Sequence, residues 1–484
     1  MNTSNTRLGA EAIEKIMHDA RRVFFLGVGG INMCSLASIT HSLGYEVSGS
    51  DRAASHVTER LKAEGITVYI GHAAENAENA DVLVYTLSIP VGNPEYTRAG
   101  ERGIPRISRA DYLGWLMHDC GVRLGVSGMH GKSTVTSMCA SILISAGVNP
   151  TISSGADIHE LGCSYRAGGR EYFLYEACEY KDSFLSFYPT TAVILNIDMD
   201  HPDYFTDIDM VKSSFAACLS RVRDTAVVNY SDKNVREVIS GSGYSCKIVK
   251  FGTSLDEGLM PREEYDVFAD NIKLSAHGSE FDLYFCGEPL GTITLHEAGL
   301  HNVSDAAAAA AAALNVGIDV LHVKEGLSRF RGAARRMEHM GVTESGADVY
   351  LDYAHHPTEI AATLRAAKLS GGHLTVIFQP HTYTRTKALF DKFADALMIA
   401  DAAAVADIYA AREDDIYGVS SEMLARAVRE RGGNAVWSGE LDGEDSEFAR
   451  LAAYAESMAG DGDVIIVMGA GDIDRATEEF HLIK

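Results

Sequence analysis

A short loop of glycine and lysine residues near residue 130 has the composition of a phosphate-binding loop. The segment Gly128-Met129-His130-Gly131-Lys132-Ser133-Thr134 follows an apolar run at 122–126 and precedes a helical pattern at 133–146. Glycines let the backbone approach phosphate oxygens, and amides at the start of a helix point toward the anion. Lys132 can neutralise the β- and γ-phosphates, and the Ser133 hydroxyl can ligate Mg²⁺. We therefore predict a nucleoside triphosphate site, although Val126 replaces the first glycine of the full Walker pattern. The alternative is a plain glycine turn with a surface lysine.

Acidic residues and a histidine follow two further apolar runs in the same part of the chain. Glu176 begins the segment Glu176-Ala177-Cys178-Glu179, and His201 ends the segment 196–201. Carboxylates and an imidazole at strand ends suit a magnesium ion that bridges a transferred phosphate. Each residue alone is more simply a solvated or hydrogen-bonded side chain. Their occurrence beside the phosphate loop favours the metal-binding interpretation.

A second glycine-rich turn lies close to the N-terminus. Gly27-Val28-Gly29-Gly30-Ile31-Asn32 follows the apolar run 23–26 and is nearly a GxGxxG fingerprint, with Asn32 in place of the third glycine. Such a turn can hold NAD, with Asp51 on the ribose, or another diphosphate such as a UDP-sugar. A purely structural strand-to-helix turn is the third interpretation.

Polar loops also follow the predicted strands of the last third of the chain. The segments 352–357 and 379–385 combine histidines, tyrosines and an arginine at the carboxyl ends of predicted parallel strands. Ligands of α/β sheets bind at that edge. His301-Asn302 precedes an alanine-rich helix, where a helix cap is the simpler interpretation. Arg335-Arg336 either contacts nucleotide phosphates or is an exposed pair at a domain join.

The elements that position these residues form three α/β units. At 484 residues the chain is too long for one ordinary core,. The order of strand, glycine turn, helix and strand is that of a βαβ unit. An alternating run at 266–285 predicts an antiparallel hairpin with Gly278 in its turn,. We expect domains at 1–120, 121–330 and 331–484, with parallel strands in the last one.

Composition and charge exclude several classes of protein. The chain is 46% hydrophobic, and it carries 42 basic against 67 acidic residues, a net charge of −25. This excludes a mainly disordered chain and disfavours general nucleic-acid binding. No apolar run approaches the length of a membrane span, and the N-terminus lacks a secretory signal. The 8 cysteines form no CxxC pair, so a zinc site is disfavoured and a reduced, cytoplasmic setting is expected,.

Taken in order, these motifs resemble the Mur ligase family over essentially the whole chain, most closely its alanine-adding type. The segments that carry the resemblance are GVGGINM, GMHGKST, EACE, NIDMDH, HN before the alanine-rich helix, RRME, DYAHHPTE, FQPHTYTRT and DIYAARE. The resemblance implies a Rossmann-like UDP-substrate domain, a central P-loop-type ATPase domain and a Rossmann-like C-terminal domain that closes over the site. The central domain is expected to have a parallel sheet plus a smaller antiparallel sheet.

The implied reaction is ATP-dependent amide formation in the synthesis of peptidoglycan precursors. The lactyl carboxylate of UDP-N-acetylmuramate attacks the γ-phosphate of ATP, and the amine of L-alanine then attacks the acyl phosphate through a tetrahedral intermediate. Mg²⁺ is the implied cofactor. The implied partners are these small molecules, with no nucleic acid and no membrane insertion, and the chain is expected to be a monomer or homodimer.

The resemblance also implies roles for individual residues. Lys132, His201 and His355 are the expected catalytic residues, His355 as the group that accepts the proton of the amine. Ser133, Glu176 and His201 are the expected metal ligands. ATP is expected on Gly128, Met129, His130, Gly131, Lys132, Ser133, Thr134, Asn302, Arg336 and Asp352. The UDP-substrate is expected on Gly27, Gly29, Gly30, Ile31, Asn32, Ser50 and Asp51, and the amino acid on His355, His381 and Arg385.

The chain departs from the family pattern at several positions. Family members usually have glycine, threonine and asparagine where Asn32, Met129 and Asp305 stand, and many have arginine in place of Thr382. The later-acting ligases place a carbamoylated lysine where Phe215 stands, so no modified lysine is expected here. The alternatives are a recycling ligase that adds a preformed peptide, an NAD-dependent dehydrogenase and a nucleotide-binding protein without turnover.

Overall fold

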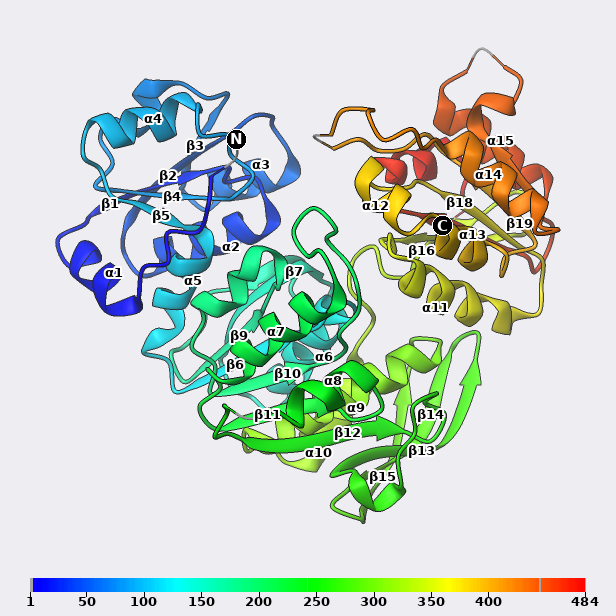
Figure 1. The fold of residues 1–484 in the computed structure, drawn as a ribbon, viewed down its shortest axis with the longest axis horizontal. Helices are drawn as coiled ribbons and strands as arrows, with labels where there is room; N and C mark the ends of the chain where they lie inside the picture. Colours follow the sequence, from blue (N-terminus) through cyan, green and yellow to red (C-terminus); the bar gives the residue numbers. More distant parts are fainter. Residues whose placement is uncertain (1–2, 242, 412, 444, 484) are drawn as a thin grey trace.

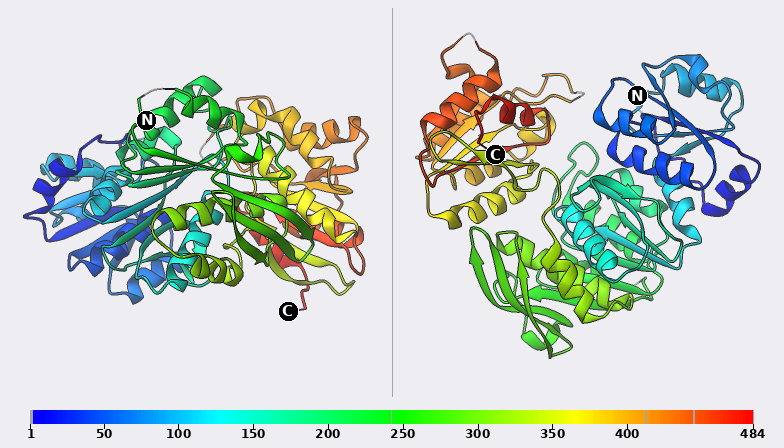
Figure 2. Two further views of the ribbon diagram at one scale, coloured as in Figure 1. Left: turned by 90° about the horizontal axis from the view of Figure 1, so that it is seen from below. Right: turned by 180° about the vertical axis from the view of Figure 1, so that it is seen from behind.

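The chain folds into three α/β units, each built on its own sheet. The computed structural model describes residues 3–241, 243–411, 413–443 and 445–483. The N-terminal and C-terminal units lie on either side of a gap, and the central unit joins them (Figures 1 and 2). This arrangement confirms the predicted fold class of three α/β domains.

The N-terminal unit is a parallel five-stranded sheet in the order β3-β2-β1-β4-β5. Its strands are β1 (Arg22–Leu26), β2 (Glu46–Asp51), β3 (Thr67–Ile70), β4 (Val82–Tyr85) and β5 (Arg106–Ser108). Its helices are α1 (Ala10–Met17), α2 (Ile31–Ser42), α3 (His56–Ala63), α4 (Pro94–Glu101) and α5 (Arg109–His118). The first βαβ unit, β1-α2-β2, is the one predicted from the glycine turn.

The central unit is a ten-stranded mixed sheet in the order β15-β14-β13-β12-β11-β10-β6-β9-β7-β8. Its strands are β6 (Val122–Ser127), β7 (Thr151–Ile158), β8 (Cys163–Arg166), β9 (Tyr172–Glu176), β10 (Thr191–Ile194), β11 (Thr225–Asn229), β12 (Lys247–Thr253), β13 (Val267–Ser275), β14 (Gly278–Phe285) and β15 (Glu288–Leu295). Its helices are α6 (Lys132–Ser145), α7 (Ile208–Leu219), α8 (Lys233–Ile239), α9 (Leu300–Asn315) and α10 (Val320–Arg329), with a 3₁₀ segment η2 (Tyr180–Ser186).

The predicted hairpin is present, and it lies near one edge of the ten-stranded sheet. Strands β13 and β14 pair antiparallel, and β15 continues the pattern on the outer side of β14. The antiparallel part is not a separate smaller sheet, because β12 pairs parallel with β13 through Phe251 and Val267. One sheet therefore runs from the phosphate loop to the outer edge of the domain. Helix α9 packs on it with alanines 306–313 fully buried, since side chains this small allow close approach.

The C-terminal unit is a six-stranded sheet in the order β16-β17-β21-β18-β19-β20. Its strands are β16 (Glu338–Val342), β17 (Asp348–Asp352), β18 (Leu374–Phe378), β19 (Ala402–Val405), β20 (Ala435–Trp437) and β21 (Val464–Met468). Its helices are α11 (Pro357–Ala367), α12 (Tyr383–Ala388), α13 (Phe390–Leu397), α14 (Ser421–Glu430) and α15 (Glu447–Ser457). The prediction of purely parallel strands was wrong at one edge, because β16 pairs antiparallel with β17. β16 is mostly half-exposed and has no buried apolar run to reveal it.

Candidate active site

The phosphate loop has the predicted position between β6 and α6. Gly128 and Gly131 adopt positive φ angles of 144° and 82°, which favour glycine,. A Cβ on Gly128 would lie 2.9 Å from the Cβ of Leu195 on the neighbouring chain segment. Both glycines are therefore needed for the path of the loop, which leads into the N-terminus of α6, where helix amides favour an anion,.

Asn196, at the end of β10, holds the loop from the side. The His130 amide donates to the Asn196 side-chain oxygen at 2.9 Å, and the Asn196 amide group donates to the His130 carbonyl at 3.0 Å. Sequence reasoning gave Asn196 no role of its own. Its position as the first residue of NIDMDH, at the end of a predicted strand, was the available signal.

Lys132 lies inside a buried, charged environment. Its ammonium group donates to the carbonyls of Gly128 and Met129 at 2.6 and 3.1 Å, and it pairs with Glu179 at 3.0 Å. Burial by itself lowers the pKa of Lys132, but the adjacent Glu179 carboxylate outweighs it and raises that pKa above its usual range. Lys132 is therefore a permanent cation at the phosphate loop, and Glu179 is its counter-ion.

Two of the three expected metal ligands, Ser133 and Glu176, contact each other, and the third, His201, contacts a different carboxylate. The Ser133 hydroxyl donates to a carboxylate oxygen of Glu176 at 2.9 Å, and the Gly155 amide donates to the same oxygen at 2.8 Å. His201, with a φ of 52°, instead lies 3.1 Å from Glu179. The Ser133 hydroxyl and the Glu176 carboxylate, which are hydrogen-bonded to each other, are oxygen ligands of the kind that Mg²⁺ prefers,. The donor set thus fits a magnesium ion at Ser133 and Glu176.

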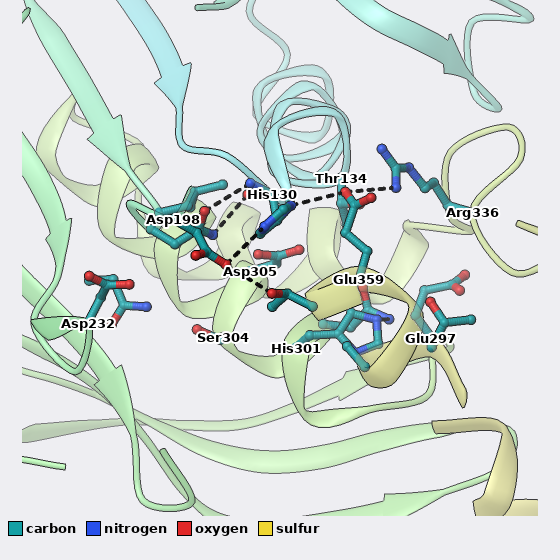
Figure 3. A pocket seen from close by; sticks show the side chains of 18 of the residues that line it. His130, Thr134, Asp198, Asp232, Glu297, His301, Ser304, Asp305, Arg336 and Glu359 are labelled. Atoms are coloured by element: carbon teal, nitrogen blue, oxygen red, sulfur yellow. Dashed lines mark hydrogen bonds and ion pairs between the residues drawn. The ribbon is translucent and has the colours of Figure 1, made fainter. Parts of the chain in front are cut away.

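A cavity of about 450 Å³ lies between the central and C-terminal units, next to the phosphate loop (Figure 3). Six of the residues expected to bind ATP line it: His130, Gly131, Thr134, Asn302, Arg336 and Asp352. The carboxylate of Asp352 accepts hydrogen bonds from the amides of Met337 and Ala354 at 2.9 and 2.8 Å. It therefore also fixes the chain segment that carries Arg336.

Asp305, one of the departures from the family pattern, points into this cavity from the second turn of α9. One of its carboxyl oxygens lies 2.8 Å from the position that a Cβ on Gly131 would occupy. Burial raises the pKa of Asp305 to about 8, against the opposing effect of the nearby Arg336 guanidinium. A protonated carboxyl group therefore lies against the phosphate loop at neutral pH.

Charged groups connect the two walls of the cavity. His130, on the phosphate loop, lies 3.7 Å from Asp198 and 3.4 Å from Glu359 of α11 (Figure 3). Burial by itself lowers the pKa of His130, but these two carboxylates raise it to about 9. Arg336 lies 3.7 Å from the same oxygen of Glu359. Sequence reasoning gave neither Asp198 nor Glu359 a role, because their partners come from distant parts of the chain.

The three residues expected to bind the amino acid lie together. Arg385 donates to Asp200 at 2.9 Å, and it lies 3.1 Å from Nδ1 of His381. The rings of His381 and His355 are 5.9 Å apart. Burial lowers the pKa of His355 to about 3 and that of His381 to about 4. Both imidazoles are therefore neutral at physiological pH, and Asp200 is a site residue that sequence reasoning missed.

The residues expected to bind the UDP-substrate gather at the carboxyl ends of β1 and β2. The amides of Gly27 and Val28 donate to the Ser50 carbonyl at 2.8 and 2.9 Å, and the Gly29 amide donates to Asp51 at 2.9 Å. Gly30 precedes α2, whose first residues are Ile31 and Asn32. The Ser50 hydroxyl lies 3.2 Å from His72, and His72 pairs with the buried Glu95 at 2.7 Å. His72 and Glu95 were not predicted.

The remaining departures have structural roles. Phe215 is fully buried in α7 and packs edge-on against Phe184, with ring centroids 5.2 Å apart. Thr382 has a φ of 65° and caps α12 by accepting from the Arg385 amide. Met129 is buried within the phosphate loop. Arg412 of the DIYAARE segment lies outside the described residues.

Comparisons with known proteins cover nearly the whole chain. Residues 22–120 match the Mur ligase family, catalytic domain, residues 126–313 match the Mur ligase middle domain, and residues 335–471 match the Mur ligase, glutamate ligase domain. The UDP-N-acetylmuramate–L-alanine ligase of Caldicellulosiruptor bescii is 42% identical over 461 residues, which cover 94% of this chain and 97% of that protein. The protein of the same name from Clostridium novyi is 42% identical over 463 residues, with coverages of 95% and 97%.

Solved structures agree with the sequence relatives. The crystal structure of UDP-N-acetylmuramate-alanine ligase from Thermotoga maritima superposes with a TM-score of 0.78 at 26% identity, covering 95% of this chain and 98% of that one. A murein peptide ligase from Psychrobacter arcticus, at 23% identity and a TM-score of 0.68 over 95% and 97% of the two chains, shares the fold. The three matched segments, the long relatives and the phosphate loop between β6 and α6 together establish that this chain belongs to the Mur ligase family.

Proposed function

We propose that this chain joins L-alanine to the lactyl carboxylate of UDP-N-acetylmuramate and converts ATP to ADP and phosphate. The observation that carries the proposal is 42% identity, over nearly the full length, to proteins named for this reaction. The site supports it, because a phosphate loop, a diphosphate-type glycine turn and a pair of neutral histidines are three different binding chemistries. A dehydrogenase would have no use for Lys132 or Ser133 in this arrangement.

ATP fits the cavity beside the phosphate loop. The amides at the start of α6 would bind the triphosphate, and Lys132 would exchange part of its contact with Glu179 for the β- and γ-phosphates. Ser133 and Glu176 would hold Mg²⁺, which when bound neutralises charge on the transferred phosphate. His201 lies on the same side and would hold a second cation. Asn302 and Arg336 would contact the nucleoside and phosphate from the opposite wall of the cavity.

The reaction forms two bonds in sequence. The lactyl carboxylate oxygen attacks the γ-phosphorus, ADP leaves, and an acyl phosphate remains. The neutral amine of L-alanine then attacks the acyl carbon, phosphate leaves, and a proton passes from the amine nitrogen to an acceptor. His355 is neutral and lies beside His381 and Arg385, so it is our candidate for that acceptor.

The proposal is tested by ADP release with Mg²⁺-ATP and UDP-N-acetylmuramate, with L-alanine, glycine, L-serine or a tripeptide added separately. We expect turnover to require both the sugar nucleotide and L-alanine. Lys132→Ala should abolish it, whereas Lys273→Ala, an exposed lysine on β13, should leave it unchanged. Faster turnover with the tripeptide would favour a recycling ligase. Tight ATP binding without any turnover would favour a binding protein.

A further inference from the structure

Arg109, at the join between the N-terminal and central units, is a cation that forms no ion pair with any described residue. It is the first residue of α5, directly after β5. Its guanidinium makes no hydrogen bond or ion pair with any residue that the structure describes. By contrast, Lys132, Arg336 and Arg385 each lie within ion-pair distance of a carboxylate. A largely buried charge without a counter-ion costs stability, so its retention needs an explanation.

The position of Arg109 is fixed by packing between the two units. Asp111, in the first turn of α5, accepts from the Ser186 hydroxyl of η2 at 2.6 Å and from the Ser108 hydroxyl at 2.9 Å. A Cβ on Gly114 would collide with the Ser186 carbonyl, so α5 lies directly against η2. Figure 1 shows α5 where the first unit meets the central one. The start of α5 is therefore held rigidly against the domain that carries the phosphate loop.

The groups that act on the charge of Arg109 belong to the phosphate-loop side of the central unit. The Glu176 carboxylate and the Cys178 thiol act electrostatically on Arg109, and the same two groups also act on Lys132. Glu176 is already occupied by the Ser133 hydroxyl and the Gly155 amide. Arg109 therefore lies within electrostatic reach of the Mg²⁺-type donor set of the central unit and forms no ion pair with it in the described structure.

The register of the first sheet places Arg109 on the edge that would hold the sugar nucleotide. Leu26 of β1 pairs with Tyr85 of β4, and Tyr85 pairs with Ser108 of β5. Gly27 and Arg109 are thus the next residues after two aligned strand ends. Two strand spacings separate them, roughly 10 Å. A sugar and lactyl group that extend along this edge from a diphosphate at Gly27–Gly30 would reach Arg109.

We propose that Arg109 binds the lactyl carboxylate of the sugar nucleotide and holds it at the phosphate loop. This inference rests on the proposed function. It makes Arg109 a specificity-determining residue. A guanidinium that forms no ion pair with a described residue should bind a substrate with a carboxylate more tightly than one without it. Charge-assisted hydrogen bonds between a guanidinium and a carboxylate are the strong class of such bonds.

The test compares two ligands that differ at the carboxylate. UDP-N-acetylmuramate and UDP-N-acetylglucosamine share the nucleotide and the sugar ring, and only the first carries the lactyl group. Affinities are measured by calorimetry with Mg²⁺ and a non-hydrolysable ATP analogue present. The wild type should prefer the acid by roughly 10- to 100-fold. Arg109→Gln should bind both ligands about equally, with its affinity for the neutral ligand and for the ATP analogue unchanged.

Two further variants complete the design. Arg109→Lys should keep part of the preference, because it retains the charge but loses the fork of donors. Arg102→Gln removes an exposed arginine of the same unit and should leave every affinity as in the wild type. Because Arg109 forms no ion pair with a described residue, Arg109→Gln should melt at the same temperature as the wild type or higher.

Several outcomes would overturn the assignment. A preference that survives in Arg109→Gln would show that another group binds the carboxylate. Equal weakening of both ligands would place Arg109 on the diphosphate or in a structural role. Weaker binding of the ATP analogue would place it on the triphosphate. Wild-type protein that binds both ligands equally would refute the role of Arg109 alone, and wild-type protein that binds neither would refute the proposed function.

Discussion

Replacing Asp305 by asparagine should make both stability and ATP binding less dependent on pH. Burial raises the pKa of this carboxyl from 3.8 to about 8 in the folded chain. The unfolded chain releases the proton near pH 4, whereas the folded chain keeps it until about pH 8. The folded state therefore loses stability relative to the unfolded state as pH rises through this window.

The size of the effect follows from the width of that window. At pH 7 the unfolded carboxyl has passed its pKa by about three units, which corresponds to about 4 kcal/mol at about 1.36 kcal/mol per unit. Asp305 is partly exposed, which reduces the cost, so Asp305→Asn should stabilise the protein by about 1 to 4 kcal/mol at pH 7. At pH 4 the two proteins should be almost equally stable. Denaturant unfolding at both pH values measures the difference.

Nucleotide binding should respond in the same direction. The carboxyl lies against Gly131, so once ionised it faces the bound phosphates across a short distance. Two unit charges about 6 Å apart repel by about 3 kcal/mol at an effective dielectric constant of about 20. Solvent access and the neighbouring Arg336 reduce this repulsion. We expect wild-type affinity for an ATP analogue to fall roughly tenfold between pH 7 and pH 9, and the affinity of Asp305→Asn to stay nearly constant.

Glu297→Gln is the matched control. Glu297 lines the same cavity near Gly332, and burial raises its pKa to about 7. If Glu297 rather than Asp305 governs binding, this variant will lose the pH dependence and Asp305→Asn will keep it. Parallel binding curves for the wild type and Asp305→Asn would refute the reasoning about Asp305.

Three other changes test separate parts of the site. Arg385→Met leaves Asp200 buried without its cation and should lower the free energy of unfolding, measured with denaturant, by about 3 to 5 kcal/mol. The double variant with Asp200→Asn should recover most of this loss. Additive losses in the double variant would contradict a direct ion pair between the two residues. The raised pKa of His130 contributes stability that is complete below about pH 6.5 and is lost as pH rises through about 9,. Scattering should therefore show the central and C-terminal units separating above pH 9, and Glu359→Gln should shift that transition to lower pH, whereas an unchanged midpoint would contradict this pairing. His355, with a pKa of about 3, does not change protonation between pH 5 and 8. We therefore expect His355→Gln to lower kcat without changing the shape of the pH–rate profile in that range.

The sequence was most informative where one short segment contains both the structure and the chemistry. The strand, glycine loop and helix at 122–146 were predictable, because the apolar run, the glycines and the helical periodicity lie side by side. The hairpin at 266–285 was predictable for the same reason. Strand β16 was not, because an edge strand with exposed side chains has no period-two apolar pattern,.

The partners of the predicted residues were harder to find than the residues themselves. Glu179 and Asp200 lie in segments that the sequence analysis quoted, but only the folded chain shows that they pair with Lys132 and Arg385. Glu359 reaches His130 across a join between two units, over more than 200 positions of sequence. Arg109 carried no motif at all. Its significance comes from the absence of a partner among the described residues, which a sequence cannot show.

The most direct test of the central claim follows the oxygen atoms of the substrate. UDP-N-acetylmuramate labelled with heavy oxygen in the lactyl carboxylate is incubated with Mg²⁺-ATP and L-alanine, and the products are analysed by mass spectrometry. An acyl phosphate that collapses to an amide predicts one heavy oxygen in each released phosphate and one retained in a product that contains L-alanine. Unlabelled phosphate, or ADP formed without an alanine-containing product, would contradict the proposed ligation.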